Sequence, residues 1–185
     1  ICNYSMYSVE EELRNGFVAV NGGHRVGVCG RTVVDNGKVK TLKDISYMNF
    51  RVAKQIIGAS DKIAGYLIRS PDSIYNTLII SPPQCGKTTL LRDLVRKLSD
   101  GSKDMNFKCS MGIPRNDVGL RTDVLDGCPK AEGIIMMIRS MSPDIVATDE
   151  IGRTEDADAI TAAVNAGVNV ITTIHGSNIT DFINK

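Results

Sequence analysis

The sequence predicts an α/β protein with a parallel sheet, preceded by a small α+β domain. From Tyr75 onward, short apolar runs alternate with stretches of helical spacing, an alternation typical of a parallel sheet with helices on its faces. Earlier in the chain, one short helical pattern is followed by several strand-like runs and by Asn36-Gly37, a strong hairpin turn. Ser70-Pro71 separates the two patterns, so we expect domains at residues 1–70 and 71–185.

The smaller domain is expected to hold a mostly antiparallel sheet. Gly16 should end its first helix. Apolar alternation and turn residues then predict strands over Phe17–Val20, His24–Val34, Val39–Leu42 and Ile45–Val52. The spacing of the apolar residues that follow predicts a second helix over Asp61–Arg69.

The larger domain is expected to alternate strand and helix. Apolar runs mark its strands, and helical spacing that ends at Gly or Pro marks its helices. In chain order we expect a strand over Thr77–Ile80, helices over Lys87–Leu98 and Pro129–Met141, a strand over Asp144–Thr148, a helix over Glu155–Asn165 and a strand over Val168–Ile174.

Residues 100–129 do not fit this alternation. A sheet of this kind needs a strand after its first helix, and the stretch offers only Met105–Lys108. Either that strand is very short or residues are missing near residues 108–109, and we favour missing residues. The chain also begins at Ile1 rather than Met and stops soon after a strand, which predicts an excerpt of a longer protein.

Composition argues against several classes of protein. The net charge is +1, whereas nucleic-acid-binding domains usually carry a basic field. We expect no signal peptide, and no apolar run approaches the roughly 18 residues of a transmembrane helix. The five cysteines are an odd number without the paired spacing of a metal site, so we expect reduced thiols in a cytosolic protein.

The most informative segment is the loop after the strand at Thr77–Ile80, which ends in Gly86-Lys87-Thr88. A strand, a tight loop and a helix are the context of a phosphate-binding P-loop, or Walker A element. Its backbone N–H groups form an anion nest, Lys87 would reach the β- and γ-phosphates, and the Thr88 hydroxyl would bind Mg²⁺. We therefore predict a nucleoside triphosphate site at Ser81, Pro82, Pro83, Gln84, Cys85, Gly86, Lys87, Thr88 and Thr89.

Ser81 departs from this motif, which usually has Gly at its first position. Gly is used there for its conformational freedom, so Ser fits only if its dihedral angles stay in an allowed region. Cys85 in the same loop could sense oxidation, although we expect it to act as a small filler.

Two carboxylates follow the strand at Asp144–Thr148 in the form of a Walker B element. Ligands bind at the carboxyl ends of such strands, so Asp149 is expected to hold Mg²⁺, directly or through water. Glu150 is expected to orient and activate the attacking water. His175 ends the next strand, where it could touch the γ-phosphate or couple its loss to movement, or could simply be a hydrogen-bonded histidine.

Residues 137–153, which include Pro143-Asp144 and Glu150-Ile151, resemble the Walker B region of the type II/type IV secretion and pilus ATPases. Thr173–Gly176 is similar to the His box of that family. Residues 112–127, together with Gly23–Gly30, resemble a branch of the family from endospore-forming bacteria. The resemblance covers nearly the whole chain.

The resemblance implies a RecA-like P-loop NTPase core with a parallel sheet, preceded by a small α+β, PAS-like domain. It implies a Mg²⁺-dependent ATPase that assembles as a homo-oligomeric ring, expected to be a hexamer, with ATP between protomers. Its partners would be membrane-embedded proteins of a secretion complex, without direct contact to nucleic acid. The protein would be cytoplasmic and peripheral at the membrane, on the mother-cell side of the forespore membrane.

The resemblance also implies roles for single residues. Lys87, Glu150 and His175 would take part in catalysis. The small domain would present an arginine to the nucleotide of a neighbouring protomer, and Arg25, Arg31 and Arg51 are the candidates. An arginine supplied in this way can raise the rate by roughly 10³–10⁵. Relatives carry an acidic box on the strand after the P-loop helix, and this sequence lacks it.

Three other functions stay open. A general secretion or pilus ATPase outside sporulation fits the core but not residues 116–127, and the zinc-binding cysteine clusters of some such proteins are absent. A nucleic-acid motor with a similar core is disfavoured by the near-neutral charge. A nucleotide-gated scaffold without turnover is left open by the departure at Ser81.

Overall fold

A computed structural model describes residues 10–20, 24–101, 107–111, 117–125 and 128–180 of the chain. The chain divides into two compact units, Ile1–Lys54 and Gln55–Lys185. The division therefore falls earlier than the boundary near residue 70 that we expected. Residues 55–70 join the second unit because they bind its first long helix: Ser60 donates a 2.7 Å hydrogen bond to Asp93, and Asp61 lies 2.8 Å from Lys97.

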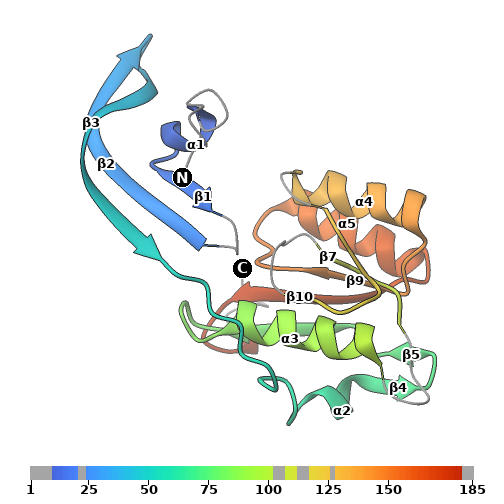
Figure 1. The fold of residues 1–185 in the computed structure, drawn as a ribbon. Coiled ribbons are helices and arrows are strands. Elements are labelled where there is room, and N and C mark those ends of the chain that lie inside the picture. The colour runs from blue at the N-terminus through green and yellow to red at the C-terminus, as the bar shows by residue number, and fades with distance from the viewer. Residues whose placement is uncertain (1–9, 21–23, 102–106, 112–116, 126–127, 181–185) are drawn as a thin grey trace. The chain divides into compact units, whose positions relative to one another are not determined.

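The first unit is a short helix, α1 (Glu10–Arg14), with a three-stranded antiparallel sheet. Its strands, in the spatial order β1-β2-β3, are β1 (Phe17–Val20), β2 (His24–Asp35) and β3 (Lys38–Arg51) (Figure 1). Gly16 ends the helix with a φ of 76°, as predicted. The buried core is small and consists of Leu13, Val18, Val26 and Val28. The predicted α+β character of this part is confirmed.

The hairpin between β2 and β3 turns at Asn36 and Gly37, whose φ angles are 49° and 74°. The predicted turn is confirmed, since two positive φ angles in a row are what such a tight hairpin requires. The two strands expected on either side of Lys43-Asp44 are one continuous strand, β3. The gap expected between those two strands is a local irregularity within β3. Asp44 has a φ of 48° there, and the register shifts between Cys29 and Arg31 on β2.

The second unit contains a five-stranded parallel sheet of order β6-β10-β9-β7-β8. Figure 1 shows α3 on one face of this sheet and α4 and α5 on the other. The strands are β6 (Thr77–Ser81), β7 (Cys109–Met111), β8 (Thr122–Val124), β9 (Ile145–Thr148) and β10 (Asn169–His175). The helices are α3 (Lys87–Asp100), α4 (Lys130–Met141) and α5 (Thr154–Asn165). The predicted parallel α/β architecture is confirmed.

Two hydrophobic clusters hold the helices to this sheet. On one side Ile145 and Ile171 pack with Leu91 and Leu94 of α3. On the other side the alternate strand residues, such as Val146 and Val170, pack with Ile134, Ala159 and Ala163 of α4 and α5. Successive strand side chains point to opposite faces, so β9 and β10 are buried on both. Their carboxyl ends are consequently held in fixed positions at one edge.

The strand after α3 is β7, three residues long; of the stretch Met105–Lys108 expected there, residues 105–106 lie outside the described residues. Phe107 and Lys108 precede it: the Phe107 side chain is buried, and the Lys108 carbonyl accepts a 2.9 Å hydrogen bond from the Asp144 N–H. Cys109 is fully buried within the sheet. The sheet therefore has the strand that the topology requires, in a short form.

The helix expected over Asp61–Arg69 is only α2 (Ala64–Leu67). The residues before it form turns because the N–H groups of Gly58 and Ser60 donate to the buried Asp93 carboxylate at 3.1 and 2.8 Å. The residues after it form β4 (Ile68–Ser70), which pairs with β5 (Ser73–Ile74). In the described part of the chain, every helix is too short or too polar to cross a membrane.

Candidate functional site

The loop between β6 and α3 contains two residues with positive φ angles, and Ser81 is not one of them. Gln84 and Gly86 have φ angles of 63° and 82°. Ser81 is the last residue of β6 and is not among the described residues with positive φ. The conformational freedom of Gly is therefore not needed at the first position of the motif, which explains how Ser fits there. Pro82, Pro83, Gln84 and Cys85 are exposed, and Thr89 is half-buried in the first turn of α3.

Lys87 is the first residue of α3, and its side chain turns back onto the loop. Its ammonium donates hydrogen bonds of 2.8 Å to the carbonyls of Ser81 and Pro82, and it lies 2.9 Å from His175 Nδ1. A lysine ammonium has three protons to donate and accepts nothing. Since its third partner is a ring nitrogen, Nδ1 of His175 must be the acceptor. An incoming phosphate would have to replace these three contacts.

The Thr88 hydroxyl donates a 2.5 Å hydrogen bond to Asp149 Oδ2. The other oxygen of the same carboxylate, Oδ1, accepts a 2.5 Å hydrogen bond from the Thr173 hydroxyl. Thr88 belongs to α3, Asp149 directly follows β9, and Thr173 lies in β10. The predicted pair Thr88 and Asp149 is thus brought together from 61 residues apart in the chain.

Glu150 follows Asp149 and is held at both its backbone and its side chain. Its N–H donates a 2.7 Å hydrogen bond to Thr173 Oγ1, and its carboxylate oxygen Oε1 lies 3.1 Å from His175 Nε2. Because Nδ1 of this ring accepts from Lys87, a neutral ring carries its proton on Nε2 and donates it to Glu150. His175 therefore connects Lys87 to Glu150.

The oxygen donors at this site fit Mg²⁺. A carboxylate oxygen and a hydroxyl oxygen already in mutual contact, at Asp149 and Thr88, are hard ligands of the kind that this ion prefers. Among the described residues no three His, Cys, Asp or Glu side chains gather into a metal site. Mg²⁺ at a nucleotide usually has only one or two protein ligands and takes the others from phosphates and water.

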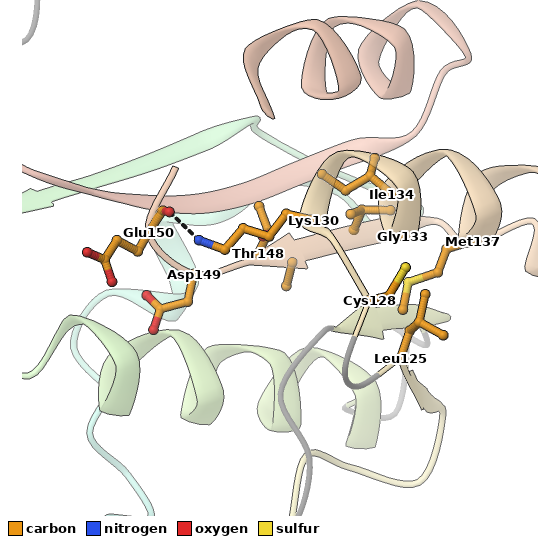
Figure 2. Close-up of a pocket in the computed structure, with 11 residues that line it drawn as sticks. Leu125, Cys128, Lys130, Gly133, Ile134, Met137, Thr148, Asp149 and Glu150 are labelled. Atoms are coloured by element: carbon orange, nitrogen blue, oxygen red, sulfur yellow. Dashed lines mark hydrogen bonds between the residues drawn. The ribbon is translucent and has the colours of Figure 1, made fainter. Parts of the chain in front are cut away.

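A cavity of about 240 Å³ adjoins the two carboxylates (Figure 2). Figure 2 shows Asp149 and Glu150 at one end, with Cys128, Met137 and Leu125 at the other. Pockets for small organic ligands have volumes of about 300–1,000 Å³. The cavity is therefore too small for a whole nucleotide. It lies between α4 and β9, beside the site. Its other lining residues are Lys130, Gly133, Ile134, Val146, Ala147 and Thr148.

The predicted arginines belong to the first unit. Arg25 on β2 and Arg51 on β3 are directly opposite each other in the sheet, and both are exposed. The Arg25 guanidinium lies 4.2 Å from the centre of the Phe17 ring. Arg31 is likewise opposite Lys43. The role of these arginines at a nucleotide stays a prediction.

Two residues of the site were not singled out from the sequence. Thr173 lies two positions before His175 on β10 and therefore on the same face of the strand, which is a signal that the sequence contains. Lys130, whose ammonium donates to the Glu150 carbonyl, had no such signal. Its contact depends on how the first turn of α4 lies beside the end of β9.

Sequence comparison matches the whole chain to one family. The family described as "Sporulation stage III, protein AA" matches residues 1–185. The stage III sporulation protein AA of Bacillus subtilis (strain 168) is 50% identical over 198 residues, covering 100% of this chain and 64% of that protein. Since the chain has 185 residues, that relative has internal residues without a counterpart here. Missing residues near residues 108–109 remain a prediction, because the comparison does not locate the difference.

Two solved structures resemble the chain in fold. The Legionella pneumophila ATPase DotB gives a TM-score of 0.62 at 17% identity, covering 87% of this chain and 45% of DotB. The pilus retraction motor PilT, solved with bound ADP, gives 0.56 at 16% identity, covering 96% of this chain and 51% of PilT. At these identities the likeness shows the fold alone, and it confirms the RecA-like α/β class. The chain spans less than two thirds of each of these three proteins.

Proposed function

Because the chain belongs to the sporulation stage III protein AA family, we propose that it is the ATPase of a secretion-type complex that acts in endospore formation. The observation that carries this proposal is the 2.5 Å hydrogen bond between Thr88 and Asp149. It joins the hydroxyl expected on a nucleotide-bound Mg²⁺ to the carboxylate expected on the same ion. Two distant segments thus meet as a phosphoryl-transfer site requires.

Each residue of the site has a role in this proposal. The loop N–H groups at the N-terminus of α3 bind the phosphates, and Lys87 exchanges its carbonyl partners for phosphate oxygens. Thr88 and Asp149 hold Mg²⁺, which neutralises phosphate charge when it is bound. Glu150 orients the attacking water and receives its proton. His175 donates to the Glu150 carboxylate and so keeps it directed at one position.

The assembly and location of the protein are part of the same proposal. We place ATP at the interfaces of a homo-oligomeric ring, a hexamer, with an arginine of the first unit completing a neighbouring site. The ring works on membrane-embedded proteins of the complex, without nucleic acid, as a cytoplasmic protein peripheral to the mother-cell side of the forespore membrane. Family membership and the fold shared with DotB and PilT support this proposal.

ATP hydrolysis by the full-length protein, measured against its own concentration, tests the proposal. Specific activity that rises steeply with concentration, and that is lost in Glu150→Gln, is the expected result. Lys87→Ala should lose nucleotide binding, whereas Glu150→Gln should keep it. Activity that is independent of concentration would contradict shared sites. Bound nucleotide without any turnover, with or without membrane fractions, would replace the motor by a nucleotide-gated scaffold.

A further inference from the structure

Glu150 has a backbone conformation that a glutamate rarely adopts. Its φ angle is 57°, in the left-handed region that favours Gly and, less strongly, Asn and Asp. Such strained residues persist only where their surroundings hold them, and they occur often at functional sites. The contacts that hold Glu150 therefore determine where its carboxylate points.

Thr173 on β10 provides one side of the support. Its hydroxyl accepts the Glu150 N–H at 2.7 Å, and its carbonyl accepts the N–H of Ile151 at 2.9 Å. These two bonds tie the N–H groups on either side of Glu150 to one residue. They leave the carbonyl of Glu150 to be held by another element.

That element is α4. Its first residue, Lys130, extends its side chain along the cavity wall and donates from Nζ to the Glu150 carbonyl (Figure 2). Lys130 is exposed, and no carboxylate in the described part of the chain lies within ion-pairing distance of it. Its ammonium therefore engages a main-chain carbonyl although two carboxylates, Asp149 and Glu150, line the same cavity.

We infer that Lys130 is a positioning residue, which holds the Glu150 peptide in its left-handed conformation so that the carboxylate meets His175. The inference rests on the proposed hydrolysis of ATP. Without the lysine, the Glu150 carbonyl loses its donor, and we expect the two hydrogen bonds to Thr173 to be insufficient to keep the backbone from relaxing to an ordinary extended conformation. That rotation would carry the Glu150 carboxylate away from His175. In the structure Oε1 of Glu150 lies 3.1 Å from Nε2 of His175.

Two substitutions of Lys130 distinguish the role of its hydrogen-bond donor from that of its apolar stem. Lys130→Met keeps a long apolar stem and removes the donor, whereas Lys130→Arg keeps a donor. We expect Lys130→Met to lower kcat by about 10- to 100-fold, since displacing a reacting group by about 1 Å can lower the rate about 10²-fold. ATP affinity should stay within about twofold, because the hydrogen bond of the Lys130 ammonium goes to Glu150 and not to the phosphate loop, and Lys130→Arg should recover most of the rate.

Lys108 supplies a matched control. Its ammonium donates at 3.2 Å to the carbonyl of Met141, the last residue of α4, so it makes the same kind of contact at the other end of the same helix. Lys108→Met should leave kcat and ATP affinity unchanged. A kcat of Lys130→Met within twofold of the wild type would overturn the inference. An equal loss in Lys130→Arg, or a loss of ATP affinity as large as the loss of kcat, would overturn it as well.

A crystal structure of full-length Lys130→Met tests the inference without using turnover. A negative φ at residue 150, with the carboxylate away from His175, is the expected result. An unchanged left-handed φ would overturn the inference whatever the kinetics show. If the wild-type protein hydrolyses no ATP under any condition, the proposed function fails, and this structure alone decides whether Lys130 holds Glu150.

Discussion

His175 lies between Lys87 and Glu150, with Nδ1 2.9 Å from the lysine ammonium and Nε2 3.1 Å from the carboxylate. One imidazole ring thus connects the residue expected on the γ-phosphate to the residue expected on the attacking water. When phosphate withdraws Lys87 from the ring, Nδ1 loses its donor and the contact with Glu150 changes in turn. If the proposed site binds ATP, His175 is therefore suited to communicate the presence of the γ-phosphate to the carboxylate of Glu150.

Replacing His175 should impair turnover more than binding. In His175→Ala, Lys87 keeps two carbonyl partners and stays available for phosphate, but Glu150 loses its side-chain partner. We expect kcat to fall about 10- to 100-fold and the ATP dissociation constant to change by less than about threefold. The control is His24→Ala, since the chain has two histidines and His24 accepts a hydrogen bond from the Ala53 N–H in the first unit. A loss of affinity equal to the loss of kcat would contradict the proposed coupling.

Arg25 offers a test of shared sites. It is directly opposite Arg51, and like charges opposite each other destabilise a sheet, which favours an anion as a further partner. If Arg25 contacts a neighbour's nucleotide, Arg25→Ala should reduce hydrolysis by about 10³-fold or more while a single protomer still binds ATP. Mixing Arg25→Ala with Lys87→Ala should restore part of the activity, because some interfaces then combine two intact halves. Unchanged hydrolysis in Arg25→Ala, with Arg14→Ala as control, would rule out this role.

The parts of the fold that could be predicted are those with local signals. The end of α3 at Gly101 and that of α5 before Gly167 follow from glycines whose φ angles are 74° and 81°. The loop at residues 81–88 could be singled out as a candidate phosphate loop because its strand, loop and helix are adjacent in the chain. The pair Thr88 and Asp149 followed from the rule that parallel strands direct their carboxyl ends to one edge.

The parts that could not be predicted depend on contacts between distant segments. The helix expected over Asp61–Arg69 is shortened by Asp93, which binds N–H groups more than 30 residues away. The irregularity at Asp44 lies within β3 because β2 continues beside it, a fact that only the pairing reveals. Lys130 reaches Glu150 only through the packing of α4 on β9. Local propensity contains none of this information.

Modification of the Cys85 thiol should inactivate the protein. Its thiol is exposed in the phosphate loop, whereas Cys109 is fully buried and burial, with the nearby Asp144, raises the pKa of that thiol to about 12. The thiolate is the reactive form, so N-ethylmaleimide should leave Cys109 unmodified and react at Cys85. The added group should block phosphate binding, and ATP with Mg²⁺ should slow the inactivation.

Cysteine-to-serine variants identify the thiol that is responsible. Cys85→Ser should bind ATP and resist N-ethylmaleimide, while Cys29→Ser should be inactivated like the wild type, since Cys29 is an exposed thiol of the first unit. Inactivation that persists in Cys85→Ser, or that ATP does not slow, would contradict the placement of this loop around phosphate.

Asp93 should make the stability of the second unit depend on acid pH. Burial alone raises the pKa of its carboxyl, but hydrogen bonds from Ser60, Arg96 and Gly58 outweigh burial and lower it from 3.8 to about 2. A carboxyl whose pKa is lowered by folding stabilises the fold at pH values above its pKa in the unfolded chain. This contribution is lost as pH falls from about 4 towards 2. The shift corresponds to about 2 kcal/mol at neutral pH.

Urea unfolding of Asp93→Asn measures this contribution. At pH 7 the free energy of unfolding should be lower than that of the wild type by at least about 2 kcal/mol, because the amide cannot satisfy all the donors that the carboxylate accepts. The difference should narrow as pH falls from 4 towards 2, where the wild-type carboxyl becomes protonated. Asp61→Asn is the control, since its pair with Lys97 is largely exposed and should contribute less than about 1 kcal/mol. The contrary result is a difference in the free energy of unfolding that is the same at pH 7 and near pH 2. It would show that the carboxylate charge is not what stabilises the contact between residues 58–60 and α3.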